Sequence, residues 1–220
     1  MSLKAVLFDM DGVIVDTEPL HRKAYFKTFE NLNITVSEEF YTSLTGCSTK
    51  EATAKIKEKY QLNVSAEDIT ASKRKYFKHY FDHDEDFDLL PGVRELITHY
   101  YETGIKLVLA SSASMNTINW VFEKFDIGKY FMGKISGAEL KASKPNPEIF
   151  IKAAEIAGEP RENCMVIEDS TNGILAANRA EIFCAAYQSE HSKLQDYHLA
   201  NILVSEFSAL ESEKIAQYFS

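Results

Sequence analysis

The chain has 220 residues, of which 45% are hydrophobic and 26% charged, an ordinary composition for one globular domain with a large insertion or for two small domains. Its formal net charge of -9 argues against binding to nucleic acid or to anionic membranes, because both interactions need basic surface. The sequence contains no apolar stretch as long as a membrane span, and its three cysteines are widely spaced. We therefore expect a cytoplasmic, monomeric protein with reduced cysteines, and Cys164 and Cys184 lie in apolar, strand-like stretches.

The first predicted element is a strand over residues 5–8, which are Ala-Val-Leu-Phe. Four apolar residues without alternation are typical of a strand that is buried on both faces of a parallel sheet. Two carboxylates follow directly, at Asp9 and Asp11, and then Gly12, which allows a sharp turn. Since sites in open α/β sheets lie beyond the carboxyl ends of the strands, we expect chemistry at this turn. The alternative is that Asp-x-Asp-Gly forms a simple turn.

Residues 17–88 are predicted to form a helical insertion without strands. The pattern predicts helices over 19–31, 37–44, 52–60 and 65–81. Thr17 or Asp16 is expected to cap the first helix, and capping-box patterns begin at Ser48 and Ser65. The predicted domains are a core made of residues 1–14 and 89–220 and a helical domain of residues 15–88.

From residue 90 onwards, predicted helices and strands alternate. Strands are expected over 105–110, 131–136, 165–167, 182–186 and 202–204. Helices are expected over 92–104, 114–125, 147–157 and 173–180, the third with Asn146 as its N-cap and Pro147 as its first residue. Strands alternating with helices imply right-handed crossovers, so we predict an α/β fold with a doubly wound parallel sheet.

Polar side chains recur at the carboxyl ends of these strands, where a parallel sheet brings them to one edge: Asp9, Asp11, Ser111, Glu168 and Asp169, with Lys144 in the loop before a helix. At ~4 Å and an effective dielectric constant of about 20, each pair of carboxylates costs roughly 4 kcal/mol. A hard divalent cation would relieve this repulsion, and oxygen ligands with an open side favour Mg²⁺. The simpler interpretation is that Ser111 caps a helix, Lys144 is solvated, and the acids merely end their strands.

Four of these motifs, in this order, resemble those of the haloacid dehalogenase superfamily. They are Phe8-Asp9-Met10-Asp11-Gly12 with its continuation to Glu18, then Ser111, Ser143-Lys144-Pro145 and Glu168-Asp169. The similarity is to the branch with a helical cap, which contains β-phosphoglucomutases and phosphatases of small metabolites. The resemblance covers nearly the whole chain and implies a Rossmann-like core with an inserted all-helical cap.

The resemblance also implies a role for each site residue. Asp9 would be the nucleophile that forms an aspartyl-phosphate, and Asp11 the general acid and base. Mg²⁺ would be held by the Asp9 carboxylate, the Asp11 backbone carbonyl and Asp169, with Glu168 bound through water or outside the direct ligands. The phosphoryl oxygens would be held by Ser111, Ser112 and Lys144. Hinge or substrate roles would fall to Thr17, His21 and Lys75, although a lone helical histidine is more often a surface residue.

The resemblance to the mutases also indicates which phosphoryl transfer to expect. The resembling mutases carry an arginine after Gly-Val-Ser in the cap and Ser-Lys-Asn after Ser-Ala in the core. This chain has Thr49 after Gly46-Cys47-Ser48, and Ser114-Met115 after Ala113. Loss of a guanidinium and an ammonium should weaken binding of a second phosphate. We therefore expect a phosphatase of small phosphorylated metabolites such as sugar phosphates.

Three alternatives remain. One is a β-phosphoglucomutase, and another is a phosphatase that hydrolyses inorganic pyrophosphate. The third, of a different class, is a catalytically inactive phosphate-binding protein. The presence of Asp9, Asp11, Lys144 and Asp169 argues against this last alternative.

Overall fold

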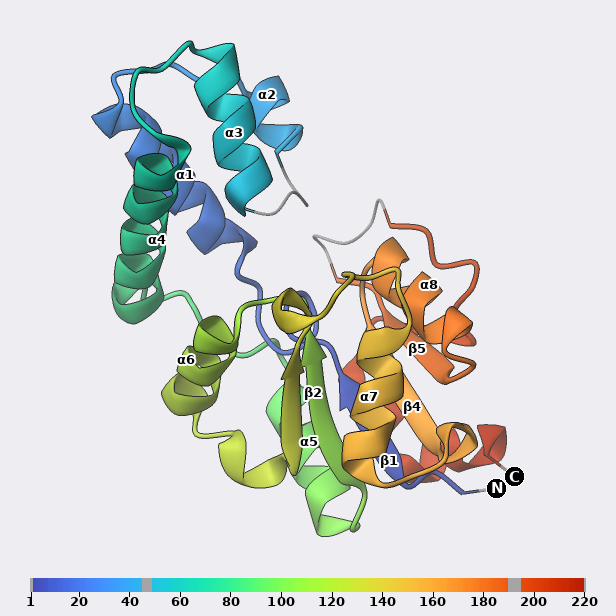
Figure 1. Cartoon of the computed structure of the whole chain (residues 1–220). Helices are drawn as coiled ribbons and strands as arrows, with labels where there is room; N and C mark the ends of the chain where they lie inside the picture. The colour runs from blue at the N-terminus through green and yellow to red at the C-terminus, as the bar shows by residue number, and fades with distance from the viewer. Residues whose placement is uncertain (1, 45–48, 190–194, 220) are drawn as a thin grey trace. The chain divides into compact units, whose positions relative to one another are not determined.

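The structure is a computed structural model that describes residues 2–44, 49–189 and 195–219. Two compact units make up the chain (Figure 1). The core unit comprises Met1–Asp16 and Asp88–Ser220, and the inserted unit comprises Thr17–Phe87. The two boundaries predicted from sequence lie after residues 14 and 88.

The core unit is built on a six-stranded, wholly parallel sheet with the strand order β3-β2-β1-β4-β5-β6. The strands are β1 Ala5–Phe8, β2 Lys106–Ser111, β3 Gly133–Ser136, β4 Cys164–Glu168, β5 Phe183–Tyr187 and β6 Ile202–Val204. In the register of the sheet, Phe8 pairs with Leu109 on one side and Ile167 on the other. The carboxyl ends of β1, β2 and β4 therefore meet at one edge. The predicted doubly wound parallel sheet is confirmed.

Helices cover both faces of this sheet, which explains why β1 shows no polar alternation. The helices of the core unit are α5 Val93–Glu102, α6 Met115–Phe125, α7 Glu148–Ala157, α8 Thr171–Arg179 and α9 Ser212–Ile215. Short 3₁₀ turns lie at Gly128–Tyr130, Gly137–Glu139, Arg161–Asn163, Phe207–Leu210 and Ala216–Tyr218. Ala5 and Leu7 pack in one hydrophobic cluster with residues of α7 and α8. On the opposite face, the Phe8 ring contacts the Tyr100 ring of α5, at a centroid distance of 6.3 Å.

Two details of the core differ from or extend the predictions. Helix α7 begins at Glu148 with Pro147 as its N-cap, so the predicted start was wrong by one residue. The reason is local: the Asn146 side-chain oxygen accepts a hydrogen bond from the Glu148 N–H at 2.9 Å and holds the preceding turn. Cys164 and Cys184 are buried and unpaired, as predicted, whereas Cys47 lies outside the described residues.

The inserted unit contains only helices among the residues that the structure describes. They are α1 Glu18–Asn31, α2 Glu38–Thr42, α3 Thr49–Lys59 and α4 Ala66–His83. The predicted cap at Ser65 is confirmed, because its hydroxyl accepts a hydrogen bond from the Asp68 N–H at 3.0 Å. Thr17 is the N-cap of α1, but its side chain makes no capping hydrogen bond. The predicted cap at Ser48 lies outside the described part of the chain.

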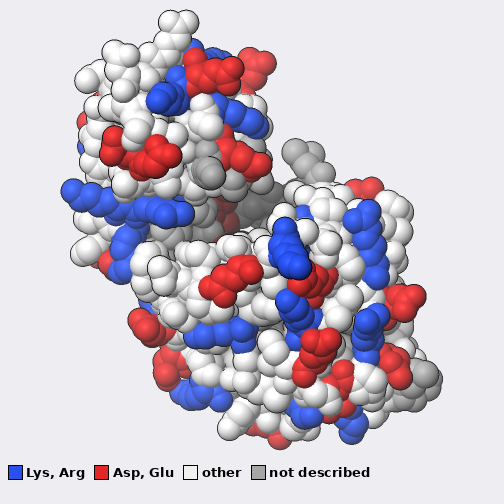
Figure 2. Space-filling view, viewed as in Figure 1, with Lys and Arg blue, Asp and Glu red and all other residues white. Residues whose placement is uncertain are grey.

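None of the described helices is long and apolar enough to cross a lipid bilayer. On the face drawn in Figure 2, basic and acidic side chains are interspersed over both units. This face therefore shows no broad basic surface of the kind that nucleic acid requires, which agrees with the net charge of -9.

Candidate active site

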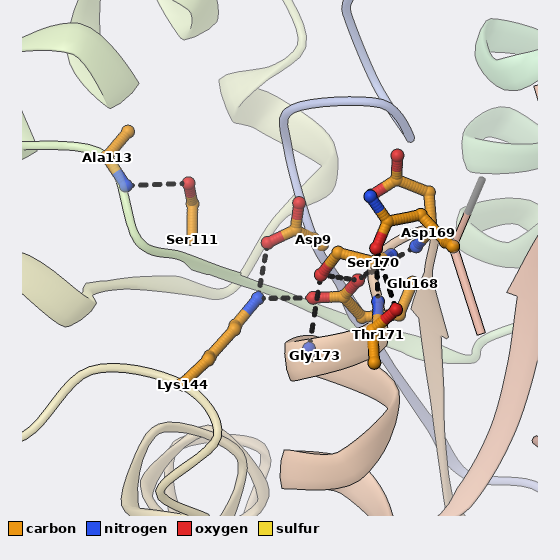
Figure 3. A network of polar contacts seen from close by, with 10 residues as sticks. Asp9, Ser111, Ala113, Lys144, Glu168, Asp169, Ser170, Thr171 and Gly173 are labelled. Carbon is orange, nitrogen blue, oxygen red and sulfur yellow. Dashed lines mark hydrogen bonds and ion pairs between the residues drawn. The ribbon is translucent and has the colours of Figure 1, made fainter. Parts of the chain in front are cut away.

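Asp9 lies at the carboxyl edge of the sheet, directly after β1. The sheet ladder extends to this residue, because the Asp9 N–H donates to the Ile167 carbonyl at 3.0 Å. Asp9 is 6% exposed, and its Oδ1 accepts a hydrogen bond from Lys144 Nζ at 2.5 Å. Lys144 Nζ also donates to Glu168 Oε1 at 2.7 Å (Figure 3). One buried lysine therefore joins the carboxylates that end β1 and β4.

The charge of Lys144 is maintained by this pairing. Burial by itself would lower the pKa of the Lys144 ammonium, but the carboxylates of Asp9 and Glu168 outweigh it and hold the pKa above its ordinary value. The lysine is therefore a fixed positive charge at the carboxyl edge of the sheet.

Glu168 uses both of its carboxylate oxygens. While Oε1 accepts from Lys144, Oε2 accepts from the N–H of Asp169 at 2.8 Å, the N–H of Ser170 at 2.8 Å and the Ser170 hydroxyl at 2.9 Å. A buried carboxylate with this many donors is held in a single position.

The carboxylates of Asp9, Glu168 and Asp169 each offer an oxygen, and these oxygens lie within 4.8 Å of one another. Burial raises the pKa of Asp9, and the charges of Glu168 and Asp11 act in the same direction against that of Lys144. Burial likewise raises the pKa of Asp169, and the neighbouring Glu168 and Asp9 add to it. Three carboxylates around one ammonium leave an excess of negative charge on hard oxygen atoms. This donor set fits a divalent cation.

The turn after β1 depends on glycine. Gly12 has a φ of +83°, and a Cβ atom at this position would lie 2.1 Å from Asp169 Oδ2. Gly12 therefore supplies both the left-handed conformation and the space for the Asp169 carboxylate. Asp11 is half-buried in the same turn, and its charge contributes to the raised pKa of both Asp9 and Asp169.

Ser111 ends β2 at the same edge and is 1% exposed. Its hydroxyl oxygen accepts a hydrogen bond from the Ala113 N–H at 3.0 Å (Figure 3). The cap of the following helix α6 is Ser114, which accepts from the Thr117 N–H at 3.4 Å. The alternative that Ser111 caps this helix was therefore wrong, and Ser112 is exposed.

The remaining predicted residues belong to the inserted unit. Thr17 is buried, His21 lies on α1, and Lys75 is exposed on α4. The lysine that contacts His21 is Lys73, which the sequence interpretation missed. A signal for it existed: α4 buries Ile69, Lys73, Phe77 and Phe81, so the lysine stands in an otherwise apolar stripe at every fourth residue.

The chain combines a parallel sheet, an inserted helical unit and a buried lysine that contacts two carboxylates at the strand ends. This combination is typical of α/β enzymes whose active site lies at the carboxyl edge of the sheet. The family model for haloacid dehalogenase-like hydrolases matches residues 6–187. The chain belongs to this family, and the predicted resemblance is confirmed.

Individual relatives agree with this assignment. A phosphorylated carbohydrates phosphatase of Thermotoga maritima is 32% identical over 82% of this chain and 82% of its own length. The β-phosphoglucomutase of Bacillus subtilis is 30% identical over 82% of this chain and 81% of its own length. The crystal structure of CbbY from Rhodobacter sphaeroides in complex with phosphate superposes with a TM-score of 0.82 at 27% identity, over 94% of this chain and 96% of that one. The protein is thus an enzyme of the hydrolase or phosphoglucomutase type.

Proposed function

We propose that the protein is a Mg²⁺-dependent phosphatase of small phosphorylated metabolites, sugar phosphates among them, which acts through a phosphoaspartate on Asp9. We further propose that it works as a cytoplasmic monomer, with the inserted unit as its cap domain. The observation that carries the proposal is the buried contact of Lys144 with both Asp9 and Glu168, beside Asp169. Support also comes from the relatives, which include a phosphatase of phosphorylated carbohydrates.

In the first half of the reaction, an Asp9 carboxylate oxygen attacks the phosphorus atom and the bond from phosphorus to the ester oxygen breaks. The carboxylic acid of Asp11 gives its proton to the departing oxygen. Lys144 and the Ser111 hydroxyl hold the phosphoryl oxygens and balance the charge that develops on them. The product alcohol leaves, and Asp9 retains the phosphoryl group.

In the second half, water attacks the phosphorus atom and the bond from phosphorus to the Asp9 oxygen breaks. Asp11, now a carboxylate, takes the proton from this water. Inorganic phosphate leaves, and both aspartates return to their starting states.

The metal ion would be held by the Asp9 carboxylate, Asp169 and the backbone carbonyl of Asp11. When bound, it neutralises charge on the phosphoryl oxygens and orients them for in-line displacement. Glu168 has both oxygens engaged by protein donors, which favours a place outside the direct ligands. Its contribution is then to keep Lys144 and the Asp169 backbone in position.

The choice of a phosphatase over a mutase rests on the residues that a second phosphate would need. Thr49 is the first residue of α3, where the resembling mutases carry an arginine. Met115, the first residue of α6, lies where they carry a lysine after Ser-Ala-Ser, and its side chain carries no charge. Without these charged ligands, a bound sugar phosphate has little to hold it through a reorientation, and water reaches the phosphoaspartate first.

The experiment is to incubate the enzyme with Mg²⁺ and β-glucose 1-phosphate, with and without glucose 1,6-bisphosphate, and to measure inorganic phosphate and glucose 6-phosphate together. Other sugar phosphates and pyrophosphate are tested in parallel, with Asp9→Asn as the control. We expect phosphate release from at least one sugar phosphate to exceed isomer formation. Efficient isomerisation with little free phosphate would establish the mutase instead. Binding of phosphate without any turnover would indicate an inactive phosphate-binding protein.

A further inference from the structure

The Glu168 carboxylate occupies space that only a glycine at position 173 leaves open. Gly173 lies in the first turn of α8 and is buried. An ideal Cβ atom on Gly173 would lie 1.6 Å from Glu168 Oε1, 1.8 Å from its Cδ and 2.4 Å from Oε2. These distances are far below any van der Waals contact. In Figure 3 the start of α8 lies directly against this carboxylate.

The Glu168 carboxylate cannot move away from the helix without losing hydrogen bonds. Glu168 is 1% exposed and accepts hydrogen bonds on both oxygens, from Lys144 on one and from residues 169 and 170 on the other. Ser170 closes the arrangement, because its hydroxyl donates to Glu168 Oε2 and accepts from the Gly173 N–H at 3.1 Å. Glycine is less favourable in a helix than alanine, so its presence at this position has a packing cause.

We propose that Gly173 is a positioning residue for Lys144. By carrying no side chain, it allows the Glu168 carboxylate to lie against the first turn of α8, and from there Glu168 Oε1 holds Lys144 Nζ beside Asp9. This inference rests on the proposed function only where it predicts a lower turnover. The displacement of Lys144 is a structural change that can be observed without any activity.

A methyl group at position 173 must push the Glu168 carboxylate away from the helix. The Cβ position lies nearest to Oε1, the oxygen that accepts from Lys144, so the displacement separates Oε1 from Lys144 Nζ. Lys144 then keeps a single carboxylate partner, and its ammonium no longer has a fixed position for the phosphoryl group. A misplacement on the order of 1 Å in such a site costs on the order of 100-fold in rate.

The test is Gly173→Ala, compared with Gly128→Ala as a matched control. A Cβ atom at Gly128 meets only a ring carbon of Phe122, at an ordinary 3.6 Å. We expect Gly173→Ala to lower kcat/KM for the best sugar phosphate by at least about tenfold, with most of the loss in kcat, and Gly128→Ala to leave it near the wild-type value. Crystal structures of the metal-free variants should show Lys144 Nζ separated from Glu168 Oε1 in Gly173→Ala and still at the native 2.7 Å in Gly128→Ala.

A rescue variant separates positioning from a general packing defect. Glu168→Asp shortens the side chain by one methylene, so Gly173→Ala/Glu168→Asp should fold and exceed Gly173→Ala alone in kcat/KM, although Glu168→Asp alone is impaired. The proposal is overturned if Gly173→Ala keeps both the native Lys144 contact and the wild-type kcat/KM, if the double variant brings no recovery, or if neither variant folds. A wild-type protein without phosphatase activity would contradict the proposed function, while the crystal structures would still decide this inference.

Discussion

Lys73 Nζ lies 2.5 Å from His21 Nδ1 and joins α4 to α1 within the inserted unit. The Lys73 side chain is 2% exposed, and its ammonium lies over the rings of Tyr25 and Phe77 at 5.0 and 4.9 Å from their centroids. The His21 ring stacks on Phe77 at 4.4 Å. A neutral imidazole therefore accepts from a buried ammonium, and aromatic faces surround the pair.

This pair predicts a pH-dependent stability. Burial, and then the charge of Lys73, lower the pKa of His21 to about 3 from its ordinary 6.5. Between these values the unfolded chain binds a proton that the folded chain does not, so the free energy of unfolding decreases as the pH falls. The slope for one proton is roughly 1.4 kcal/mol per pH unit.

Urea unfolding between pH 6.5 and 4 measures this slope. We expect His21→Gln to unfold with a flatter pH dependence than the wild type, and His79→Gln, which changes an exposed histidine on α4, to keep the wild-type slope. Equal slopes for His21→Gln and the wild type would show that His21 does not stay neutral in the folded protein.

A second prediction concerns the buried lysine of the core. Lys144→Met should lower the free energy of unfolding by roughly 3 kcal/mol or more in the absence of metal, because it leaves the buried Asp9 and Glu168 carboxylates without their ammonium. Lys106→Met is the matched control. Its half-exposed pair with Glu159 contributes only ~0–1 kcal/mol. Similar losses in the two variants, measured by chemical unfolding, would contradict the central position of Lys144.

Removal of the metal ion should stop the reaction without unfolding the chain. We expect EDTA to abolish phosphate release and added Mg²⁺ to restore it, while circular dichroism stays unchanged, because Lys144 already compensates part of the carboxylate charge. Full activity in the presence of the chelator would exclude a metal cofactor from the mechanism.

The inserted unit is predicted to move relative to the core when ligand binds. The chain crosses between the units twice, at residues 16–17 and 87–88, and closure would exclude water from the phosphoryl group. Small-angle scattering with Mg²⁺, with and without a phosphate analogue, should give a smaller radius of gyration in the bound state. Identical profiles would count against a mobile cap.

The parallel sheet and the carboxylates at its edge could be predicted from sequence, because predicted strands alternate with predicted helices and acidic residues follow the strands. Asp9 follows an unalternating apolar strand, and a parallel sheet brings the ends of its strands to one edge, so the placement of Asp9 and Glu168 needed no tertiary knowledge. Lys73 was not predicted as a contact of His21, although it lies in an otherwise apolar stripe of α4, because the partner of a buried lysine on another helix depends on how the two helices pack. Gly173 could not be assigned at all, because its importance arises only where α8 approaches a carboxylate from another element.

The most direct test of phosphoryl transfer through Asp9 is detection of the phosphoaspartate itself. Asp11→Asn should accumulate it from an aryl phosphate, because an aryl leaving group needs no proton whereas the attacking water needs a base. After rapid acid quenching, mass spectrometry of the peptides should place a labile phosphoryl group on Asp9, and Asp9→Asn/Asp11→Asn should carry none. Turnover of the aryl phosphate by Asp11→Asn without any phosphorylated Asp9, or with the phosphoryl group on another residue, would contradict the account.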